Sequence, residues 1–156
     1  MTSTEYVSSS APFTVRRRVR FGDCDPAGVV YTVRFSDYVV SAMELFFAEL
    51  FGANRAEQAD RFGVDMPLKA LRFTFSRALR CDDEFAMVVT IGEIRQRTFD
   101  LNITALSDSG LDLFESVLTP ICIHASGERR STLIPAMMRE RLTDYARRRD
   151  TRSAED

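Results

Sequence analysis

The sequence predicts an α+β fold in which one antiparallel sheet wraps around a single long helix. Residues 34–51 have the period of a helix but are apolar over most of its circumference, so other elements must cover them. Between Leu68 and His124, four stretches with the two-residue period of strands follow one another with short turns between them. Consecutive strands joined in this way form an antiparallel sheet, and a single apolar helix is buried only inside the curl of such a sheet.

The central helix is identified by where its polar residues fall. They lie three or four positions apart, on one narrow stripe of a helix: Arg34, Asp37, Ser41 and Glu44. The apolar positions form two further stripes, the first with Phe35, Tyr38, Val39, Ala42, Leu45 and Phe46, the second with Val40, Met43, Phe47 and Phe51. A surface helix needs only one apolar face, so we expect this helix to be central and buried. Thr32 is the expected N-cap, and Gly52 is the expected C-terminal stop.

The other elements are predicted from changes of period along the chain. Residues 13–21 alternate between apolar and polar side chains and form a first strand, which a turn at 23–28 ends. Residues 55–62 form a short polar helix or loop. The later strands are expected at residues 68–79, 85–91, 99–105 and 111–124. Pro120 favours a bulge or an edge position in the last strand, and Pro135 opens a final Arg-rich helix over residues 136–149.

Length and composition indicate one globular domain. A chain of 156 residues, 45% hydrophobic and 28% charged, is long enough to bury a proper core. We expect residues 1–11 to be a disordered N-terminal lead-in, residues 12–150 the single domain and residues 151–156 a polar tail. The formal charge of −2 gives no general affinity for nucleic acid or anionic membranes. No secretory leader and no run of about 18 apolar residues is present, which predicts a cytoplasmic protein.

The composition makes a single arginine or cysteine weak evidence for a functional site. Only Lys69 among the 21 basic residues is a lysine, so any one arginine is a poor indicator of a special role. Cys24, Cys81 and Cys122 are widely spaced and form no CxxC pair, which predicts free thiols rather than a disulfide framework. We expect neither a metal site nor a cofactor.

The most informative motif occupies residues 21–31 and reads FGDCDPAGVVY. This motif resembles the signature of the 4-hydroxybenzoyl-CoA thioesterase family of hotdog-fold enzymes. Weaker similarity continues at residues 63–67, 82–83, 93–99 and 127–135. The resemblance implies the hotdog fold, in which an antiparallel sheet wraps around one long central helix. That architecture agrees with the fold predicted from the residue pattern alone.

The resemblance assigns catalysis to the second aspartate of the motif, Asp25. A thiolate leaves readily without protonation, so one carboxylate suffices to attack the thioester carbonyl or to deprotonate a water. The N-terminus of the central helix can stabilise the oxyanion, and the resemblance implies the backbone amides of Tyr31 and Thr32 as its donors. The implied reaction is hydrolysis of an acyl-CoA, or of an acyl group on a carrier protein. Coenzyme A enters only as part of the substrate.

The nucleotide of CoA carries phosphates, which favour cations around its site. Residues 93–99 resemble the family segment that supplies a basic nucleotide contact, which implies Arg97 and, beside it, Arg95. Residues 127–130 resemble a second such segment and imply Arg130, with Arg129 as the alternative. All of these are also ordinary turn-flanking charges. Because one sheet around one helix leaves long edges, we expect a homodimer or a homotetramer.

Other interpretations stand beside these assignments. Asp25 precedes a proline and is typical of an Asx turn, and Asp23 is interpreted as a turn cap. Glu44 belongs to the polar stripe of the helix, and His124 lies far from the motif. The residues after position 31 depart from the family pattern, so the acyl group stays open. The rival function is a non-catalytic hotdog protein that binds an acyl-CoA or an acyl-carrier protein, or that serves as a scaffold. A hydratase or dehydratase is disfavoured because no histidine lies near the motif.

Overall fold

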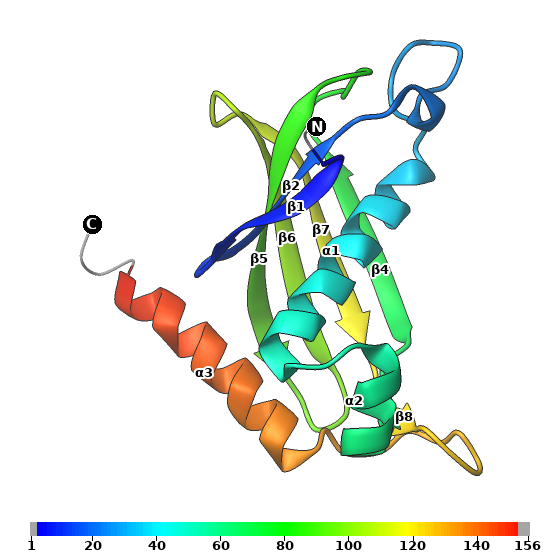
Figure 1. Cartoon of the computed structure of the whole chain (residues 1–156), viewed down its shortest axis with the longest axis vertical. Coiled ribbons are helices and arrows are strands. Elements are labelled where there is room, and N and C mark those ends of the chain that lie inside the picture. Colours follow the sequence, from blue (N-terminus) through cyan, green and yellow to red (C-terminus); the bar gives the residue numbers. More distant parts are fainter. Residues whose placement is uncertain (1–2, 153–156) are drawn as a thin grey trace.

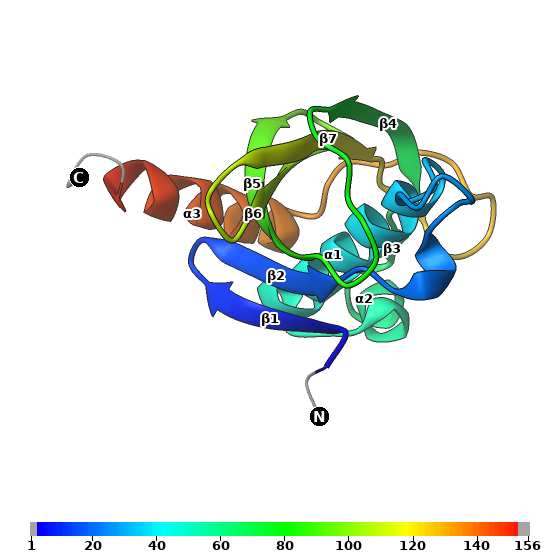
Figure 2. The same ribbon diagram turned by 90° about the horizontal axis from the view of Figure 1, so that it is seen from above.

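The long helix α1, Arg34–Phe51, runs through the centre of the molecule and is enclosed by a six-stranded antiparallel sheet (Figure 1, Figure 2). The computed structural model describes residues 3–152. The sheet has the order β1-β2-β5-β6-β7-β4. Its strands are β1 (Glu5–Ser10), β2 (Phe13–Arg18), β4 (Leu68–Phe75), β5 (Glu84–Ile94), β6 (Phe99–Ser107) and β7 (Asp112–Pro120). This arrangement confirms the predicted architecture of one sheet around one helix.

Shorter elements close the ends of the sheet. The 3₁₀ turn η1 (Phe21–Asp23) precedes α1, and helix α2 (Arg55–Phe62) follows it. The two-residue strands β3 (Val64–Asp65) and β8 (Ile123–His124) pair with each other, and the last helix is α3 (Ala136–Arg152). Over residues 3–152, each helix is too short or too polar to cross a membrane.

α1 is buried over most of its circumference, as the sequence predicts. Its buried side chains come from both apolar stripes: Phe35, Tyr38, Val39, Ala42, Met43, Phe46, Phe47 and Phe51. Gly52 ends the helix in the left-handed region, at φ 64°, which confirms its expected role. The bounds of α1 therefore follow from the hydrophobic pattern and from one glycine.

The start of α1 differs from the prediction. Thr32 is not the N-cap, because Val33 holds that position and has no side-chain cap. The amides of Arg34 and Phe35 donate to the carbonyl oxygens of Tyr31 and Thr32, so the backbone is already wound before the helix begins. These backbone bonds start the helix without help from a capping side chain.

The strands turn one face toward α1 with the predicted two-residue period. In β5 and β6 the buried positions alternate: Phe85, Met87, Val89, Phe99, Leu101, Ile103 and Ala105. β4 ends at Phe75 rather than at residue 79, and β7 ends at Pro120. The pairing of β4 with β7 is irregular at Pro120, as expected for a residue that cannot donate to the ladder. β1 and β4 are the two edges of the sheet.

The structure corrects the prediction for the N-terminal segment. Residues 5–10, expected within a disordered lead-in, form β1 and pair antiparallel with β2. Glu5 forms an ion pair with Arg17 at 3.2 Å and accepts a hydrogen bond from the Ser41 hydroxyl of α1 at 2.7 Å. Polar side chains thus fix this strand, and no apolar alternation marks it in the sequence. Residues 1–2 lie outside the described residues.

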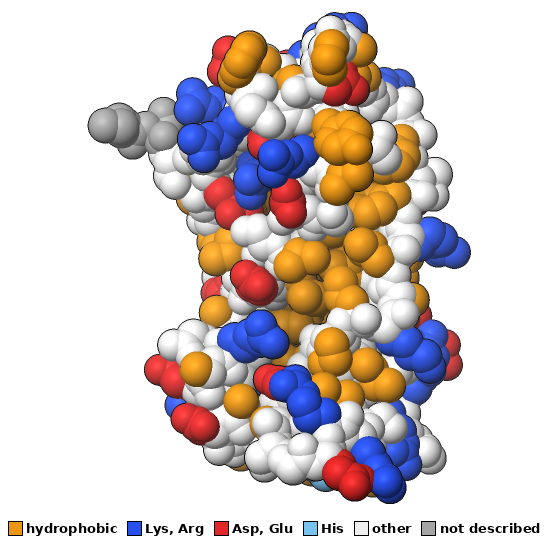
Figure 3. Space-filling view, turned by 90° about the vertical axis from the view of Figure 1, so that its right-hand side faces the viewer, with side chains coloured by type: hydrophobic (Ala, Val, Ile, Leu, Met, Phe, Trp, Pro, Cys, Tyr) orange, Lys and Arg blue, Asp and Glu red, His pale blue; other side chains and the backbone are white. Residues whose placement is uncertain are grey.

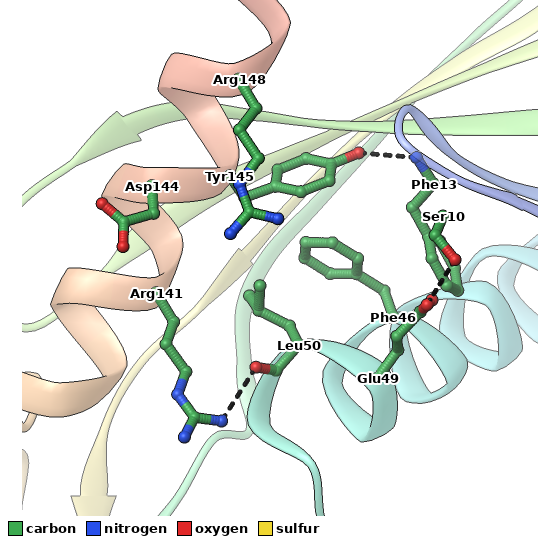
Figure 4. A pocket seen from close by; sticks show the side chains of 9 residues that line it. All are labelled: Ser10, Phe13, Phe46, Glu49, Leu50, Arg141, Asp144, Tyr145 and Arg148. Carbon is green, nitrogen blue, oxygen red and sulfur yellow. Dashed lines mark hydrogen bonds between the residues drawn. The ribbon is translucent and has the colours of Figure 1, made fainter.

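The last helix ties the C-terminal end of α1 to the sheet. The Tyr145 hydroxyl of α3 accepts a hydrogen bond from the Phe13 amide at 2.9 Å (Figure 4) and also donates to the Val89 carbonyl oxygen, which the figure does not draw. A cavity of about 330 Å³ lies beside this tyrosine, between α3, α1 and the turn from β1 to β2. α3 reaches Arg152 and so includes the first two residues of the expected tail, while residues 153–156 lie outside the described part.

Replacing Phe46 by Asp should unfold the protein. Phe46 is 1% exposed and packs edge-to-face on Phe13 and Tyr145, with ring centroids 5.3 and 4.9 Å apart. The substitution buries an unpaired carboxylate and removes these contacts, which should cost more than about 4 kcal/mol of unfolding free energy. Circular dichroism and thermal melting measure the outcome. Leu133→Asp, at a side chain 57% exposed, is the control and should melt close to the parent. A cooperatively folded Phe46→Asp protein would contradict the buried position of α1.

Candidate active site

Asp25 stands at the first position of a tight turn that leads into α1. Its carbonyl oxygen accepts from the Gly28 amide, and its own amide donates to the Val29 carbonyl oxygen, both at 2.9 Å. Pro26 fixes the backbone of the second position. Gly28 adopts φ 80°, a left-handed conformation that glycine takes without strain. The sequence Asp-Pro-x-Gly therefore builds this turn by local chemistry alone.

Only one of the two carboxylate oxygens of Asp25 accepts a hydrogen bond within the turn. Oδ1 accepts a hydrogen bond from the Ala27 amide at 2.8 Å, which is the Asx turn that the alternative interpretation predicts. Oδ2 has no partner among residues 3–152, and the side chain is partly exposed. The turn thus orients the carboxylate and leaves one oxygen for a substrate or a water. The structural and the catalytic interpretations of Asp25 are compatible.

Backbone hydrogen bonds decide which amides stay available at the start of α1. The Val30 amide donates to the Leu79 carbonyl oxygen at 2.8 Å, and the Tyr31 amide donates to the Asp23 carbonyl oxygen at 2.9 Å. Tyr31, one of the two expected oxyanion donors, is therefore already engaged. The Thr32 amide, the other expected donor, has no acceptor in the part of the chain that the structure describes. It lies at the positive end of the α1 dipole.

Asp23 anchors the turn to α1. Its Oδ2 accepts hydrogen bonds from the Arg20 amide at 3.1 Å and from the Tyr38 hydroxyl at 2.8 Å. The bond to the Arg20 amide agrees with the interpretation of Asp23 as a turn cap. Burial, and then the bond to Asp23, raise the pKa of the Tyr38 hydroxyl above its ordinary value. The sequence analysis missed this contact, although a tyrosine on a buried helix stripe signals that its hydroxyl needs a partner.

A cavity of about 370 Å³ adjoins the start of α1. Its lining comes from the turn, from α1 and from the chain at the end of β4: Val29, Val30, Thr32, Phe35, Phe75, Ser76, Arg77, Ala78 and Leu79. Phe35 and Phe75 meet edge-to-face with ring centroids 4.8 Å apart and form an aromatic wall. The cavity offers room for a small apolar group beside the Thr32 amide, whereas Asp25 lies outside its lining.

Two of the three arginines implied for CoA binding meet at one corner of the molecule. Arg97 donates to the carbonyl oxygen of Ser131 at 3.0 Å and to its hydroxyl at 3.2 Å, which brings Arg97 next to Arg130. The Arg130 side chain is 79% exposed and forms an ion pair with the exposed Glu128 at 2.7 Å. Arg129, the alternative to Arg130, is held by Asp65 at 2.6 Å. Arg97 and Arg130 therefore lie close together at the surface, and Arg130 is the more exposed of the two neighbours.

Arg95, the third implied arginine, is committed to neighbouring carboxylates. It makes two parallel hydrogen bonds to Asp100, at 3.1 and 2.8 Å, and an ion pair with Glu93 at 3.0 Å. The paired hydrogen bonds raise the pKa of Arg95 and lower the pKa of Asp100. Arg95 fixes the turn between β5 and β6 instead of presenting a cation to a ligand.

Within one chain, the structure does not bring Asp25 and the arginine pair together. Asp25 belongs to a hairpin of residues 23–31, whose Val29 and Val30 line the same cavity as Phe75. It therefore lies at the Phe75 end of β4. Arg97 lies at the opposite end: its carbonyl oxygen accepts from the Cys122 amide, and the adjacent Ile121 amide donates to the carbonyl oxygen of Pro67, just before Leu68. The 8 residues of β4 therefore lie between them, a length of roughly 25 Å.

The remaining candidate side chains lie apart from the turn. His124 is exposed and pairs with Val64 in the short β3–β8 ladder. Glu44 is exposed on α1 and lines a cavity of about 590 Å³ between α1, α2 and β3. Burial raises the pKa of the Cys122 thiol to about 11, which makes it unreactive at neutral pH. Among residues 3–152, no three His, Cys, Asp or Glu side chains are grouped so that they hold a metal ion.

Sequence comparison relates this chain to hydrolases of acyl-CoA thioesters. Residues 19–142 match the family model described as the Thioesterase-like superfamily. The chain is 26% identical over 135 residues to the 1,4-dihydroxy-2-naphthoyl-CoA hydrolase of Synechococcus elongatus, which covers 86% of this chain and 95% of that protein. It is 28% identical over 87 residues to the 4-hydroxybenzoyl-CoA thioesterase of Pseudomonas sp. strain CBS-3, which covers 55% of this chain and 62% of that protein.

Solved structures share the fold. A 1,4-dihydroxy-2-naphthoyl-CoA thioesterase from Synechocystis superposes with a TM-score of 0.75 at 22% identity, over 85% of this chain and 96% of that one. The 4-hydroxybenzoyl-CoA thioesterase from Pseudomonas sp. strain CBS-3 superposes with a TM-score of 0.73 at 21% identity, over 89% of this chain and 99% of that one. These similarities confirm the predicted hotdog fold.

Proposed function

The chain belongs to the Thioesterase-like superfamily, and we propose that it hydrolyses an acyl-CoA thioester to the free acid and CoA. One observation carries this proposal. Before the start of α1, Oδ2 of Asp25 and the amide of Thr32 both lack partners in the part of the chain whose side chains are described, and both belong to the segment that leads from the turn into the helix. A carboxylate and an oxyanion donor are the two groups that this reaction requires. The names of the two relatives above support the same reaction class.

In the proposed mechanism, the thioester carbonyl oxygen accepts a hydrogen bond from the Thr32 amide, at the positive end of the α1 dipole. Oδ2 of Asp25 then acts in one of two ways. As a nucleophile it attacks the carbonyl carbon, CoA leaves as its thiolate, and water hydrolyses the anhydride formed on Asp25. As a base it removes a proton from a water that attacks the same carbon, and the tetrahedral intermediate expels the thiolate. Neither course needs a histidine.

We place the acyl group in the 370 Å³ cavity beside Thr32. The aromatic wall of Phe35 and Phe75 favours a flat apolar group, because aromatic rings pack well edge-to-face. The two named relatives act on naphthoyl and benzoyl thioesters, which are flat aromatic groups of this kind. An aryl-CoA is therefore the proposed substrate class.

A second copy of the chain is the proposed partner. β4 is an edge strand, and its side chains Leu71 and Phe75 are 39% and 47% exposed. Figure 3 shows apolar side chains gathered along the middle of the face that carries α1 and β4, with charged side chains around them. An exposed edge strand beside an apolar surface favours pairing with another chain.

A two-fold dimer of this kind would complete the site. Two β4 edges that pair antiparallel set the Phe75 end of one strand beside the Leu68 end of the other. Asp25 of one chain then approaches Arg97 and Arg130 of the partner subunit, although the same residues lie roughly 25 Å apart within one chain. The dimer thereby accounts for a catalytic turn and a phosphate-binding corner at opposite ends of the fold.

The rival proposal is a hotdog protein that binds acyl-CoA without hydrolysing it. Such a protein needs the cavity and the arginines but has no use for the free carboxylate oxygen of Asp25. The two proposals therefore predict different effects of removing that carboxylate: the enzyme loses turnover, whereas the binding protein is unaffected.

Asp25→Asn should abolish most of the turnover and keep the turn. The asparagine side-chain oxygen accepts from the Ala27 amide as Oδ1 does now, so only the charge and the free oxygen are lost. We expect kcat to fall by about 10² to 10⁴, while a non-hydrolysable CoA analogue still binds. A thiol-trapping assay with aryl, short-chain and long-chain acyl-CoAs measures turnover, and thermal melting of the same sample checks the fold.

The matched control for this variant is Asp108→Asn. Asp108 lies in the exposed turn between β6 and β7 and forms an ion pair with Arg16 at 2.6 Å. Its replacement removes one carboxylate outside the turn that carries Asp25 and should leave turnover unchanged. Hydrolysis by Asp25→Asn within a few-fold of the parent would remove the catalytic assignment and favour the acyl-CoA-binding protein.

Arg97→Ala should raise KM much more than it lowers kcat. A phosphate contact acts equally on the bound substrate and on the transition state, so its loss weakens binding by about tenfold or more without slowing the chemical step. The effect should shrink with a pantetheine thioester that lacks the nucleotide. Arg95→Ala is the comparison and should change KM far less, because Arg95 is held by Asp100. Equal losses with CoA and pantetheine thioesters would place Arg97 outside the nucleotide site.

A further inference from the structure

We propose that Tyr38 is a positioning residue whose hydroxyl, through Asp23, sets the spacing between the Asp25 carboxylate and the Thr32 amide. Its expected effect on turnover rests on the proposed function, whereas its effect on the turn does not. Tyr38 touches neither the cavity nor Asp25 and acts only through Asp23.

Asp23 is the point at which three segments meet. Oδ2 of its carboxylate accepts from the Arg20 amide, where the 3₁₀ turn begins, and from the Tyr38 hydroxyl, in the second turn of α1. Its carbonyl oxygen accepts from the Tyr31 amide, where the hairpin ends. One residue thus joins both sides of the hairpin to the helix. Asp25 lies two residues after Asp23, and Thr32 directly follows Tyr31.

The Tyr38 side chain is held in place by the packing around its ring. Its side chain is 0% exposed, and its ring lies between Phe35 and Phe85, with centroid distances of 5.9 and 5.5 Å. The Arg17 guanidinium covers the ring at 4.5 Å from its centroid, and Glu5 of β1 holds Arg17 in turn. Because the pKa of the Tyr38 hydroxyl is raised, the hydroxyl stays protonated and donates at any working pH. The ring cannot follow the turn if the turn moves.

The hydrogen bonds of Asp23 indicate that it positions the turn and is not a second catalytic carboxylate. One oxygen of Asp23 accepts both of the hydrogen bonds that its side chain makes to the turn and to α1. An amide oxygen can accept the same two bonds, whereas it cannot act as a base. Asp23→Asn should therefore retain most of the turnover, which distinguishes it from Asp25→Asn.

Tyr38→Phe is the direct test, because it removes one oxygen and keeps the buried ring. Asp23 then loses its bond to α1, and the hairpin is free to shift relative to the Thr32 amide. We expect kcat to fall by about tenfold or more, on the scale of the roughly 10²-fold loss that a 1 Å misplacement can cause. KM should stay close to the parent value, since the nucleotide contacts lie at the other end of β4.

The chain offers a matched control in Tyr145→Phe. Tyr145 is also a buried tyrosine, and its hydroxyl accepts a hydrogen bond from the Phe13 amide (Figure 4). The same hydroxyl donates to the Val89 carbonyl oxygen. It packs on Phe46, near the end of α1 that is remote from the turn. Tyr145→Phe should lower the melting temperature at least as much as Tyr38→Phe does, and should leave kcat unchanged.

Amide hydrogen exchange in the parent and both variants completes the test. The bonded amides of Asp25, Gly28 and Tyr31 should exchange faster in Tyr38→Phe than in the parent, and at the parent rate in Tyr145→Phe. Unchanged exchange in Tyr38→Phe would overturn the proposal, even if kcat fell. A kcat loss no larger than that of Tyr145→Phe would also overturn it. If the parent hydrolyses no thioester, the proposed function fails, and the exchange rates alone still decide the positioning role.

Discussion

The burial of α1 inside the sheet is the constraint on which the rest of the structure depends. Eight apolar side chains of this helix are covered, so its axis is fixed relative to β5, β6 and β7. A fixed axis leaves the N-terminal end as the place where the helix presents free amides and a positive dipole. The Asp-Pro-x-Gly turn leads directly into that end and brings Asp25 with it. Asp23 and Tyr38 then tie the turn to the helix, so the core itself sets the geometry of the candidate site.

The same constraint divides the candidate site between two ends of the fold. β4 lies at an edge with the turn at one end and the Arg97–Ser131 contact near the other, and its own length keeps the two apart. We propose that an antiparallel partner at the β4 edge brings the turn of one chain beside the arginine pair of the other, because it reverses the order of the ends. In this account, dimerisation is part of the site rather than an addition to it.

The sequence predicted what depends on strong local patterns and missed what depends on tertiary pairing. The buried face of α1 follows from its hydrophobic period and its end at Gly52 from turn chemistry, and the structure agrees with both, whereas Val33 takes the N-cap position predicted for Thr32. The sequence did not predict β1, because this strand is held by the ion pair between Glu5 and Arg17. Such a polar contact leaves no periodic pattern in the sequence. Tyr31 is engaged by Asp23 and Arg95 by Asp100, whereas Thr32 and Arg97 have no such partner in the described part of the chain, and the motif alone does not reveal which of these contacts form. The motif gave the right turn, but only the fold shows which of its atoms are free.

We propose that each active site combines Asp25 of one chain with Arg97 of the partner chain. To test this, the Asp25→Asn and Arg97→Ala proteins are mixed, dissociated and reassociated, and turnover is measured at low acyl-CoA concentration. Half of the dimers in an equal mixture are hybrids, and each hybrid holds one site with both native residues, so turnover should recover to about a quarter of the parent value. A mixture no more active than the average of the two variants would show that the two residues do not share a site across chains.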